Sequence, residues 1–479
     1  MTDAATPDSP PVLVWFRRDL RLADHPALAA AAEAGPVIPV FILDPETEAT
    51  GAAHRWRLER SLERLAAGLH RHRSRLILRR GDALETIRTL VRETGAKAVH
   101  WSRLYDPAGT DRDAAVKAAL KADGIAARSF NGSLLFEPWE VETGTGGFYK
   151  VYTPYWKAVR GRDVAAPTGE PKFSLPEAWP ESLSLGDLSL GRDMGRGAEV
   201  VARYVEAGED AARERLEAFL AGPVADYAEA RDRLDRDGTS RLSHHFAVGE
   251  LSPRQAWAAA LPLREGEAAK GAEGFLQEIV WREFAYHLLF HTPQLTHRNW
   301  REEWDDFPWR EDNDDAEAWR RGRTGQPLVD AAMRELYVTG YMHNRMRMLT
   351  ASFLTKHLMT HWRVGEAWFR EHLVDWDPAS NSMGWQWAAG SGPDAAPFFR
   401  IFNPATQAEK FDPRGAYRRR WLAELSANPG EDARAFHEAC PPSWGLSPED
   451  GLAPERVDLK AGRERALAAY SELKARRAA

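Results

Sequence analysis

Short apolar runs rich in β-branched and aromatic residues recur through the first 131 residues, separated by stretches long enough for helices. The five runs are "VLVWF" from residue 12, "VIPVFIL" from 37, "RLILR" from 75, "AVHW" from 98 and "IAARSF" from 125. Apolar strands that alternate with helical connections are typical of a parallel sheet with helices on both faces. The pattern therefore predicts a doubly wound α/β domain over residues 12–131.

The regular pattern lapses between about residues 132 and 205. Turn-forming residues accumulate there, in "ETGTGGFYKVYTP" and "AAPTGEPKFSLPEAWPES". An irregular stretch of this length is uncommon inside one domain and usually marks a linker or a functional wrap. We interpret residues 132–205 as a loop that connects two domains.

After about residue 205 nearly every segment has the period of a helix. Helix starts are recognisable, as in "LSPRQAW", where Ser252 can cap the helix and Pro253 suits its first turn. We expect residues 206–479 to form an all-α domain.

Length and composition are those of a globular protein with two or three domains. The 479 residues are 43% hydrophobic and 28% charged, and no apolar run approaches the roughly 20 residues that span a bilayer. The first eleven residues are polar and Pro-rich, unlike a secretory signal. Cys440 is the only cysteine, which excludes an internal disulfide and fits a reducing compartment. We therefore expect a cytoplasmic protein with no membrane contact.

Charge and tryptophan content point to the second half of the chain. The net charge of −7 does not by itself favour a nucleic-acid partner, so DNA binding would need a local basic groove. Of the 19 Trp, eleven fall between Trp281 and Trp421. Because each buried indole N–H also needs a partner, core filling alone seldom requires this density.

Residues 237–245, "DGTSRLSHH", place three hydroxyls at what the pattern indicates is the entry to a helix. Hydroxyls and free backbone N–H groups at a helix N-terminus make an anion site suited to a pyrophosphate. The alternative is an ordinary N-cap with no ligand.

Residues 277–290, "QEIVWREFAYHLLF", form a predicted helix. Its core-facing side chains are Ile279, Phe284, Leu288 and Leu289. Glu278 and Arg282 are four residues apart, which favours a surface ion pair. The functional alternative is a carboxylate aimed into a pocket, with Trp281 close enough to stack on whatever Glu278 contacts.

Residues 341–362 contain an amide, cations and soft thioethers. On a helix Asn344, Arg347 and Met348 share a face, whereas Arg345 points about 100° away and could meet a phosphate. A Met-rich core helix is the alternative, and it accounts for Met346 and Met348 but not for the Asn and the two Arg.

Residues 375–392, "DWDPASNSMGWQWAAGSG", place two indoles one residue apart. Residues two positions apart on a helix do not face each other, so Trp385 and Trp387 should lie on different sides of one element. A tryptophan can stack on a base, which is worth roughly 1 to 3 kcal/mol, or can be oxidised reversibly by one electron. Plain packing is the alternative for each.

Taken together, these segments resemble the photolyase and cryptochrome family, specifically bacterial class I and class III photolyases of cyclobutane pyrimidine dimers. The motifs are "WFRRDLRLADHPAL", "GTSRLS", "WREF", "TGQPLVDAAMREL", "GYMHNRMRM", "NSMGWQWAAGSGPDAAPFFRIFNP" and "QAEKFDP". They extend in order from about Val12 to about Trp444. The resemblance implies an N-terminal α/β antenna domain, a long connecting loop and a C-terminal helical domain that encloses FAD.

The resemblance also implies which side chains hold the cofactor. Those expected at the FAD phosphates and ribityl chain are Tyr227, Thr239, Ser240, Leu242 and Ser243. Those expected around the flavin are Arg282, Asn344, Arg347, Asp375, Asp377 and Asn381. Asn381 would lie beside the ring nitrogen that accepts a proton on reduction. No metal site is expected.

The implied substrate is DNA damaged by ultraviolet light, whose dimer stacks poorly and therefore flips out of the duplex at lower cost than a normal base. The lesion pocket would be lined by Glu278, Trp281, Asn344, Met348 and Trp387. The two Trp would stack on the flipped pair, and Glu278 would stabilise the radical anion formed when light drives an electron from reduced FAD into the dimer. Phosphate contacts are expected from Arg231, Arg345 and Arg400.

Trp385, Trp362 and Trp309 match the family's electron chain, which refills the flavin from the protein surface. Trp376 is a departure, because many relatives have a small residue between the two aspartates. It either provides a side branch for the electron or fills space, and packing is the preferred interpretation.

A second, antenna chromophore is also implied. Some folate-binding relatives have an Asn-Glu pair where this chain has Ala108 and Gly109. Methenyltetrahydrofolate held in another way, an 8-hydroxy-deazaflavin and an empty pocket all stay open, with a slight preference for folate.

Two other classes of protein compete with a monomeric repair enzyme. A cryptochrome would be a signalling flavoprotein of the same fold, but Asn381 and the "MHNR" segment favour repair. The other is a Trp-rich helical interaction protein with no cofactor, which would be colourless when purified.

Overall fold

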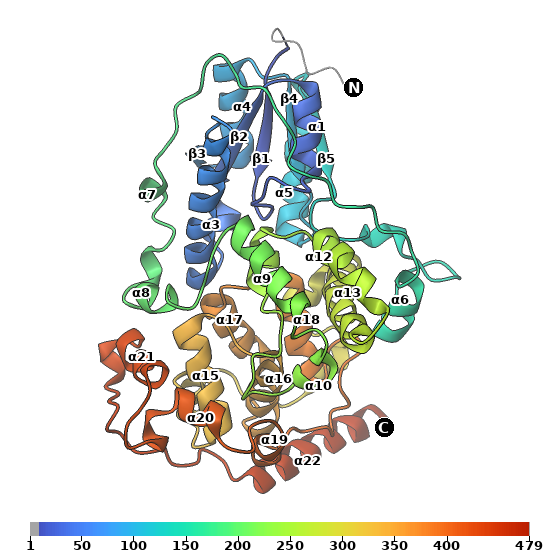
Figure 1. Ribbon diagram of the computed structural model, residues 1–479. Coiled ribbons are helices and arrows are strands. Elements are labelled where there is room, and N and C mark those ends of the chain that lie inside the picture. Colours follow the sequence, from blue (N-terminus) through green and yellow to red (C-terminus); the bar gives the residue numbers. More distant parts are fainter. Residues whose placement is uncertain (1–8, 479) are drawn as a thin grey trace.

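The computed structural model describes residues 9–478, in which a sheet domain is joined to a helical domain (Figure 1). Every predicted apolar run forms a strand of one parallel sheet with the order β3-β2-β1-β4-β5. The strands are β1 (Val12–Phe16), β2 (Val37–Leu43), β3 (Ile77–Arg80), β4 (Ala98–Ser102) and β5 (Ala126–Phe130). Because β2 and β4 flank β1 on opposite sides, the chain winds outwards in both directions, and the doubly wound fold is confirmed.

Helices cover both faces of this sheet. Side chains of β1 such as Val14 pack with α1 (Pro26–Ala34) and α3 (Ala52–Arg71). The next residue, Trp15, packs on the opposite face with α4 (Ala83–Thr94) and α5 (Pro107–Ala122). Since β1 and β2 are buried on both faces, they are apolar throughout and show no alternation in the sequence, whereas the edge strands β3 and β5 carry exposed positions. The short α2 (Pro45–Glu48) follows β2.

The connecting segment 132–205 is held by hydrogen bonds to the sheet domain. Its main elements are the 3₁₀ turn η1 (Pro138–Glu140), α6 (Tyr152–Val159), α7 (Leu185–Leu188) and α8 (Gly197–Val201). Between α6 and α7 the chain is extended: Thr168 O accepts from Asp24 N at 2.8 Å and Ser174 O from Val37 N at 3.0 Å. Figure 1 shows this segment rising beside the sheet and returning to the helical domain. It follows that the segment is a wrap around the sheet domain and not a loose tether.

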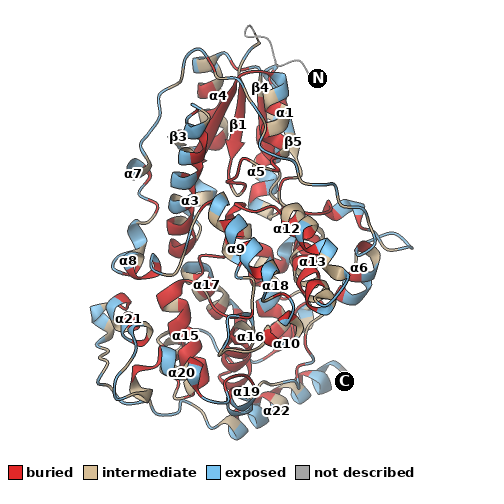
Figure 2. Cartoon of the chain, in the orientation of Figure 1, coloured by how far each residue is buried: buried red, intermediate tan, exposed pale blue. Residues whose placement is uncertain are grey.

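Residues 206–478 are mainly helical, and the longest helix among them has 23 residues. The helices are α9 (Glu209–Ala221), α10 (Tyr227–Ala230), α11 (Ser243–Val248), α12 (Pro253–Ala260), α13 (Ala269–His291), α14 (Asp314–Arg320), α15 (Pro327–Thr339), α16 (Asn344–Ser352), α17 (Trp362–His372), α18 (Pro378–Ala389), α19 (Pro404–Phe411), α20 (Ala416–Trp421), α21 (Glu431–Ala439) and α22 (Leu459–Ala478). Buried positions dominate α13, α15 and α18 (Figure 2). The capping role of Ser252 is confirmed, with Gln255 completing a capping box.

Residues 341–362 are divided between two helices. After α16 the chain makes a π-helical turn, Phe353–His357, and Met359 adopts a positive φ of 55° before α17 begins. Such turns are typical of functional regions of helices. The break lets Asn344 and Trp362 start separate helices whose axes differ.

A fully buried ion pair joins the two domains. Arg57 of α3 and Glu250, just before α12, are both 0% exposed, and their side chains are hydrogen-bonded. Burial alone would raise the pKa of Glu250, but Arg57 lowers it to about 2, so the carboxylate is ionised. Glu250 also binds His245 of α11, so the position of α11 depends on the sheet domain. No helix within residues 9–478 is long and apolar enough to cross a membrane.

Candidate functional site

Two carboxylates lie at the start of α18. Asp377 is its N-cap residue: Oδ1 accepts from Ser380 N at 2.7 Å, and Oδ2 accepts from the Tyr286 hydroxyl. Asp375 Oδ2 accepts from Arg347 at 2.6 Å, while Oδ1 is buried with no hydrogen-bond partner among the described residues. Burial alone would lower the pKa of Arg347, but Asp375 raises it, so the guanidinium keeps its charge. Asp375 therefore keeps one oxygen for a ligand, whereas Asp377 is engaged within the protein.

Asn381 lies one turn further along α18. Its Nδ2 donates to Glu366 Oε1 at 2.9 Å and to the backbone oxygen of Glu366 at 3.3 Å. Burial raises the pKa of Glu366, although the bond from Asn381 opposes this. Within residues 9–478 nothing donates to Asn381 Oδ1. The amide is thus oriented so that its oxygen can accept a hydrogen bond from a ligand.

The loop before α11 presents hydroxyl groups beside a guanidinium. Arg215 donates to the backbone oxygens of Thr239 and Ser240 at 2.9 and 2.8 Å. No side chain caps α11, and the hydroxyls of Thr239, Ser240 and Ser243 have no hydrogen-bond partner in the described part of the chain. The ordinary N-cap interpretation is therefore wrong, and these groups are available to an anion. Leu242, the residue before α11, is buried.

The segment that follows α10 joins α13 to α16. Arg231 donates to Glu278 of α13 at 2.6 Å, and Asp232 accepts from Arg345 of α16 at 2.6 Å. The expected pair between Glu278 and Arg282 is wrong, because Arg282 instead donates to the backbone oxygen of Ser133 at 2.7 Å. The i, i+4 spacing makes a pair within one helix possible but does not require it. Glu278 instead pairs with Arg231, the residue that follows α10.

Burial raises the pKa of Glu278 above its ordinary value, although Arg231 pulls it down. The side chain of Glu278 is 29% exposed, so it is reachable from outside. Arg231 also lies over the ring of Tyr227, 5.7 Å from its centroid, and Tyr227 is buried against Phe219 and Phe275. A carboxylate with a raised pKa and one cationic partner is suited to donating or accepting a hydrogen bond as its surroundings change.

The residues expected at the lesion are all accessible to some degree. Trp281, Met348 and Trp387 are half-buried and Asn344 is exposed, as is Arg400, which is expected at a phosphate. Their neighbours on the same helices are in the core, as Trp385 shows with 2% exposure against the half-buried Trp387. The prediction that the two indoles of α18 face different ways is borne out by this contrast in burial.

The three tryptophans of the predicted electron chain run from the core towards the surface. Trp385 packs so closely on Gly365 of α17 that a Cβ there would lie 2.0 Å from its ring. Trp362, at the start of the same helix, donates its N–H to Asn299 at 2.8 Å and is 0% exposed. His361 lies between Trp362 and the half-buried Trp309, with its ring centroid 5.5 Å from each.

Comparison with known proteins identifies the family. Residues 12–172 match the DNA photolyase domain, and residues 275–472 match the FAD binding domain of DNA photolyase. The deoxyribodipyrimidine photo-lyase of Agrobacterium fabrum is 46% identical, over 97% of this chain and 98% of the relative. The chain belongs to the DNA photolyase family.

The similar proteins include photolyases and cryptochromes. The crystal structure of a bacterial class III photolyase from Agrobacterium tumefaciens has a TM-score of 0.89 and 44% identity, covering 99% of this chain and all of that one. Cryptochrome-1 of Arabidopsis thaliana is 37% identical over 97% of this chain and 69% of its own length. The two-domain architecture is therefore that of the photolyases, and the chain carries their FAD-binding domain.

The side chains of this photolyase fit FAD. An unpartnered oxygen on Asp375 and one on Asn381 can accept from ring N–H groups, and the unpaired hydroxyls before α11 can bind a pyrophosphate. The matched FAD-binding domain includes both these acceptors but begins after the loop at 239–243. No group of three or more His, Cys, Asp or Glu among residues 9–478 is placed to hold a metal ion.

A cavity of about 400 Å³ lies at the carboxyl ends of β1 and β2. Its lining includes Leu104 and Asp106, which follow β4, so the cavity reaches the point between β1 and β4 where the strand order reverses and where doubly wound folds bind ligands. The lining also includes Arg17, Arg112, His54, Gly109 and Trp376. Burial lowers the pKa of His54 to about 3, so its ring is neutral, and its Nδ1 has no partner in the described chain.

Three residues named in the sequence analysis line this cavity: Ala108, Gly109 and Trp376. Gly109 is required by space, because a Cβ would lie 2.9 Å from both Asp106 and Leu104. A glutamate at this position, as in some folate-binding relatives, would therefore need the loop to shift. Trp376 is half-buried between the cavity and the start of α18, and its ring meets that of His54 edge-on at 5.6 Å.

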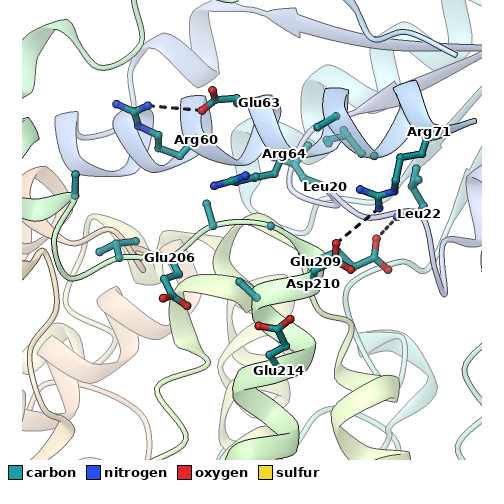
Figure 3. Close-up of a pocket in the computed structure, with 18 of the residues that line it drawn as sticks. Leu20, Leu22, Arg60, Glu63, Arg64, Arg71, Glu206, Glu209, Asp210 and Glu214 are labelled. Atoms are coloured by element: carbon teal, nitrogen blue, oxygen red, sulfur yellow. Dashed lines mark hydrogen bonds and ion pairs between the residues drawn. The ribbon is translucent and has the colours of Figure 1, made fainter. Parts of the chain in front are cut away.

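A larger cavity, of about 640 Å³, separates α3 from α9 (Figure 3). Figure 3 shows Arg64 and Arg71 of α3 on one side and Glu206, Asp210 and Glu214 on the other. These side chains are exposed, and Arg71 approaches Asp210 only to 3.8 Å. The cavity is thus a solvated space between the domains whose lining holds more acidic than basic side chains.

Sequence reasoning missed several residues at the site. Glu366 follows Trp362 by four residues, so the sequence alone could have placed the two side chains on the same face of a helix. Tyr152, in the connecting segment, stacks on Trp281, and Lys356 donates to the backbone oxygen of Arg400 at 3.1 Å. No local pattern predicts either contact, because each joins elements distant in the sequence.

Proposed function

We propose that this chain repairs cyclobutane pyrimidine dimers in DNA with the energy of light. The observation that carries the proposal is the near full-length relative, 46% identical, that is named a deoxyribodipyrimidine photo-lyase. The paired acceptors on Asp375 and Asn381 beside the half-buried Trp387 support it, because one helix thereby offers groups to a cofactor and a stacking surface to a substrate.

In this proposal the core of the helical domain binds FAD. When bound in its reduced state, FAD supplies on absorbing light the electron that opens the cyclobutane ring and takes it back afterwards. Asp375, held by Arg347, and Asn381, held by Glu366, orient the ring system through their free oxygens. Asn381 Oδ1, which has no donor among residues 9–478, would hold the ring nitrogen that gains a proton on reduction. Trp385, Trp362 and Trp309 conduct electrons inwards from the surface.

The substrate in this proposal is a dimer flipped out of ultraviolet-damaged DNA. Trp281 and Trp387 provide stacking surfaces, and Asn344 and Met348 complete the wall. Glu278 donates or accepts a hydrogen bond at the thymine edge, for which its raised pKa is favourable. The exposed Arg400, with Arg231 and Arg345, supplies charge to the phosphates.

Arg231 and Arg345 have carboxylate partners in the free protein, Glu278 and Asp232. DNA phosphates would have to compete with these partners. Binding would then release Glu278 from its guanidinium as the lesion arrives, which raises its pKa further where a protonated carboxyl is useful.

A second chromophore in the cavity at the ends of β1 and β2 would serve as the antenna. His54 and Arg112 are positioned on its wall, and Trp376 separates it from α18. The close fit at Gly109 favours a deazaflavin or a folate held differently from relatives that have Asn-Glu there.

The competing function is light signalling, because Cryptochrome-1 is 37% identical. The experiment that decides is illumination of purified, reduced protein with dimer-containing oligothymidine, following recovery of thymine absorbance. Recovery is expected; binding of FAD without recovery would favour signalling, and a colourless protein would contradict both.

We further propose a cytoplasmic monomer, consistent with the single cysteine, buried at position 440. Sedimentation of the purified protein near its 53.8 kDa chain mass is the expected result, and a dimer mass would contradict it.

A further inference from the structure

The connecting segment contributes an aromatic ring to the predicted lesion wall. Tyr152, the first residue of α6, stacks on Trp281 of α13 with ring centroids 3.6 Å apart and planes inclined by 6°. Rings this close and parallel cover one face of the indole. A second ring can therefore stack only on the opposite face of Trp281.

Tyr152 is fixed on several sides. Its hydroxyl donates to the backbone oxygen of Gln277, one turn before Trp281, at 2.8 Å. Its backbone N–H donates to Asp394 at 3.1 Å, and Phe284 meets the rings of Tyr152 and Trp281 edge-on at 5.9 Å each. The tyrosine is 7% exposed, so it is held in place before any substrate arrives.

The contact lies within the charged part of the site. Burial raises the pKa of Tyr152, and the Glu278 carboxylate raises it further, so the phenol keeps its proton and remains a donor. Asp394, which binds Tyr152, belongs to the segment before the exposed Phe399 and Arg400. One tyrosine thus links the connecting segment, α13 and the segment that carries a predicted phosphate contact.

We infer that Tyr152 is a positioning residue for recognition of the flipped dimer: it holds Trp281 in the orientation in which the indole stacks on the lesion. The inference rests on the proposed function. A fixed indole loses less conformational freedom when a ligand binds. The fixed orientation therefore raises the affinity for damaged DNA, whose flipped bases reach Trp281. An intact duplex, which contacts the phosphate-binding side chains, gains nothing from Trp281.

The test compares Tyr152→Leu with Tyr152→Phe in the FAD-loaded protein, using one oligonucleotide with and without a dimer. Tyr152→Leu keeps apolar bulk but removes the stack, and we expect a loss of dimer affinity of about 3- to 10-fold with unchanged affinity for the undamaged strand. Tyr152→Phe keeps the stack and should stay within about 2-fold of the parent. The repair rate at saturating dimer should be unchanged in both variants. Tyr152→Leu should therefore raise KM and leave kcat as in the parent.

Tyr204→Leu is a matched control, because Tyr204 also contacts an indole, that of Trp421, at 6.4 Å, away from the lesion wall. It should change neither affinity. Should Tyr152→Leu fail to fold, Asp394→Ala removes an anchor of Tyr152 and is expected to lower the ratio of dimer to undamaged affinity about 2-fold or more.

The outcomes of these measurements distinguish a failure of the inference from a failure of the proposed function. An unchanged affinity ratio in the folded Tyr152 or Asp394 variant overturns the inference, as does an equal loss for both strands. A parent protein that shows no preference for the dimer instead refutes the proposed function. A loss in Tyr152→Phe equal to that in Tyr152→Leu would assign the effect to the hydroxyl and also overturn the stacking role.

Discussion

Glu366 fixes the orientation of Asn381: the amide Nδ2 donates to Glu366 Oε1 at 2.9 Å, which leaves the amide oxygen without a donor among residues 9–478. Replacing Glu366 by Leu removes this acceptor. We expect the midpoint potential of the bound flavin to shift by a few tens of millivolts, the equivalent of the roughly 1 kcal/mol of one hydrogen bond. A redox titration of the FAD-loaded variant measures this shift.

Glu366→Gln is the control for that prediction, because a glutamine can still offer an oxygen to Asn381. It should restore the parent potential. If Glu366→Leu titrates like the parent, the orientation of Asn381 does not depend on this bond.

Arg231 and Glu278 form an ion pair at 2.6 Å, but we expect changes of the two residues to have different effects. Arg231→Met should weaken binding to damaged and undamaged DNA alike and reduce the salt slope by about one. Glu278→Gln should leave binding nearly intact and lower the repair yield per bound dimer. Binding isotherms at several salt concentrations and a single-turnover repair assay measure the two effects; identical phenotypes would contradict the division of roles.

The contrast between Trp385 and Trp387 predicts a separation of photoreduction from binding. Trp385→Phe should abolish light-driven reduction of bound FAD yet spare repair by chemically reduced protein. Trp387→Ala should lower dimer affinity by about 5- to 150-fold, the equivalent of stacking worth roughly 1 to 3 kcal/mol. Loss of photoreduction in Trp387→Ala but not in Trp385→Phe would reverse the assignment.

Trp376 tests whether electrons have a second route. Because its ring meets that of His54 and its indole N–H has no partner among residues 9–478, packing is the expected role. Trp376→Phe should therefore leave photoreduction rates within about 2-fold while costing about 1 kcal/mol of stability. A slower rate, measured by transient absorption, would establish the branch.

Lys356 predicts a pH-dependent stability. Burial lowers the pKa of Lys356 from 10.5 to about 7, and the positive charge of Arg400 contributes a smaller part of this shift. The folded protein thus binds this proton less tightly than the unfolded chain, and its stability falls as the pH drops from about 10.5 to about 7. Lys356→Met should be more stable than the parent by about 1 to 4 kcal/mol at pH 7, with the difference shrinking towards pH 10. Thermal unfolding at both pH values checks this, and a difference independent of pH would exclude the buried charge as its cause.

Local patterns in the sequence determined the secondary structure of the parts that matter here. The five apolar runs were recognisable as strands of a parallel sheet, and Ser252 as a helix cap, because strand formation and capping depend on neighbours within a few residues. The different directions of Trp385 and Trp387 follow from helix geometry alone. The family resemblance supplied the expectation of a cofactor and a substrate, which periodicity could not.

Only the tertiary structure decided which side chains are partners. Glu278 pairs with Arg231, 47 residues away, and not with Arg282 on its own helix. Likewise Tyr152 reaches Trp281 across the connecting segment. The physical reason is that periodicity encodes which face of a helix is buried, whereas the partner on that face depends on how helices distant in the sequence pack together, and several arrangements satisfy the same pattern.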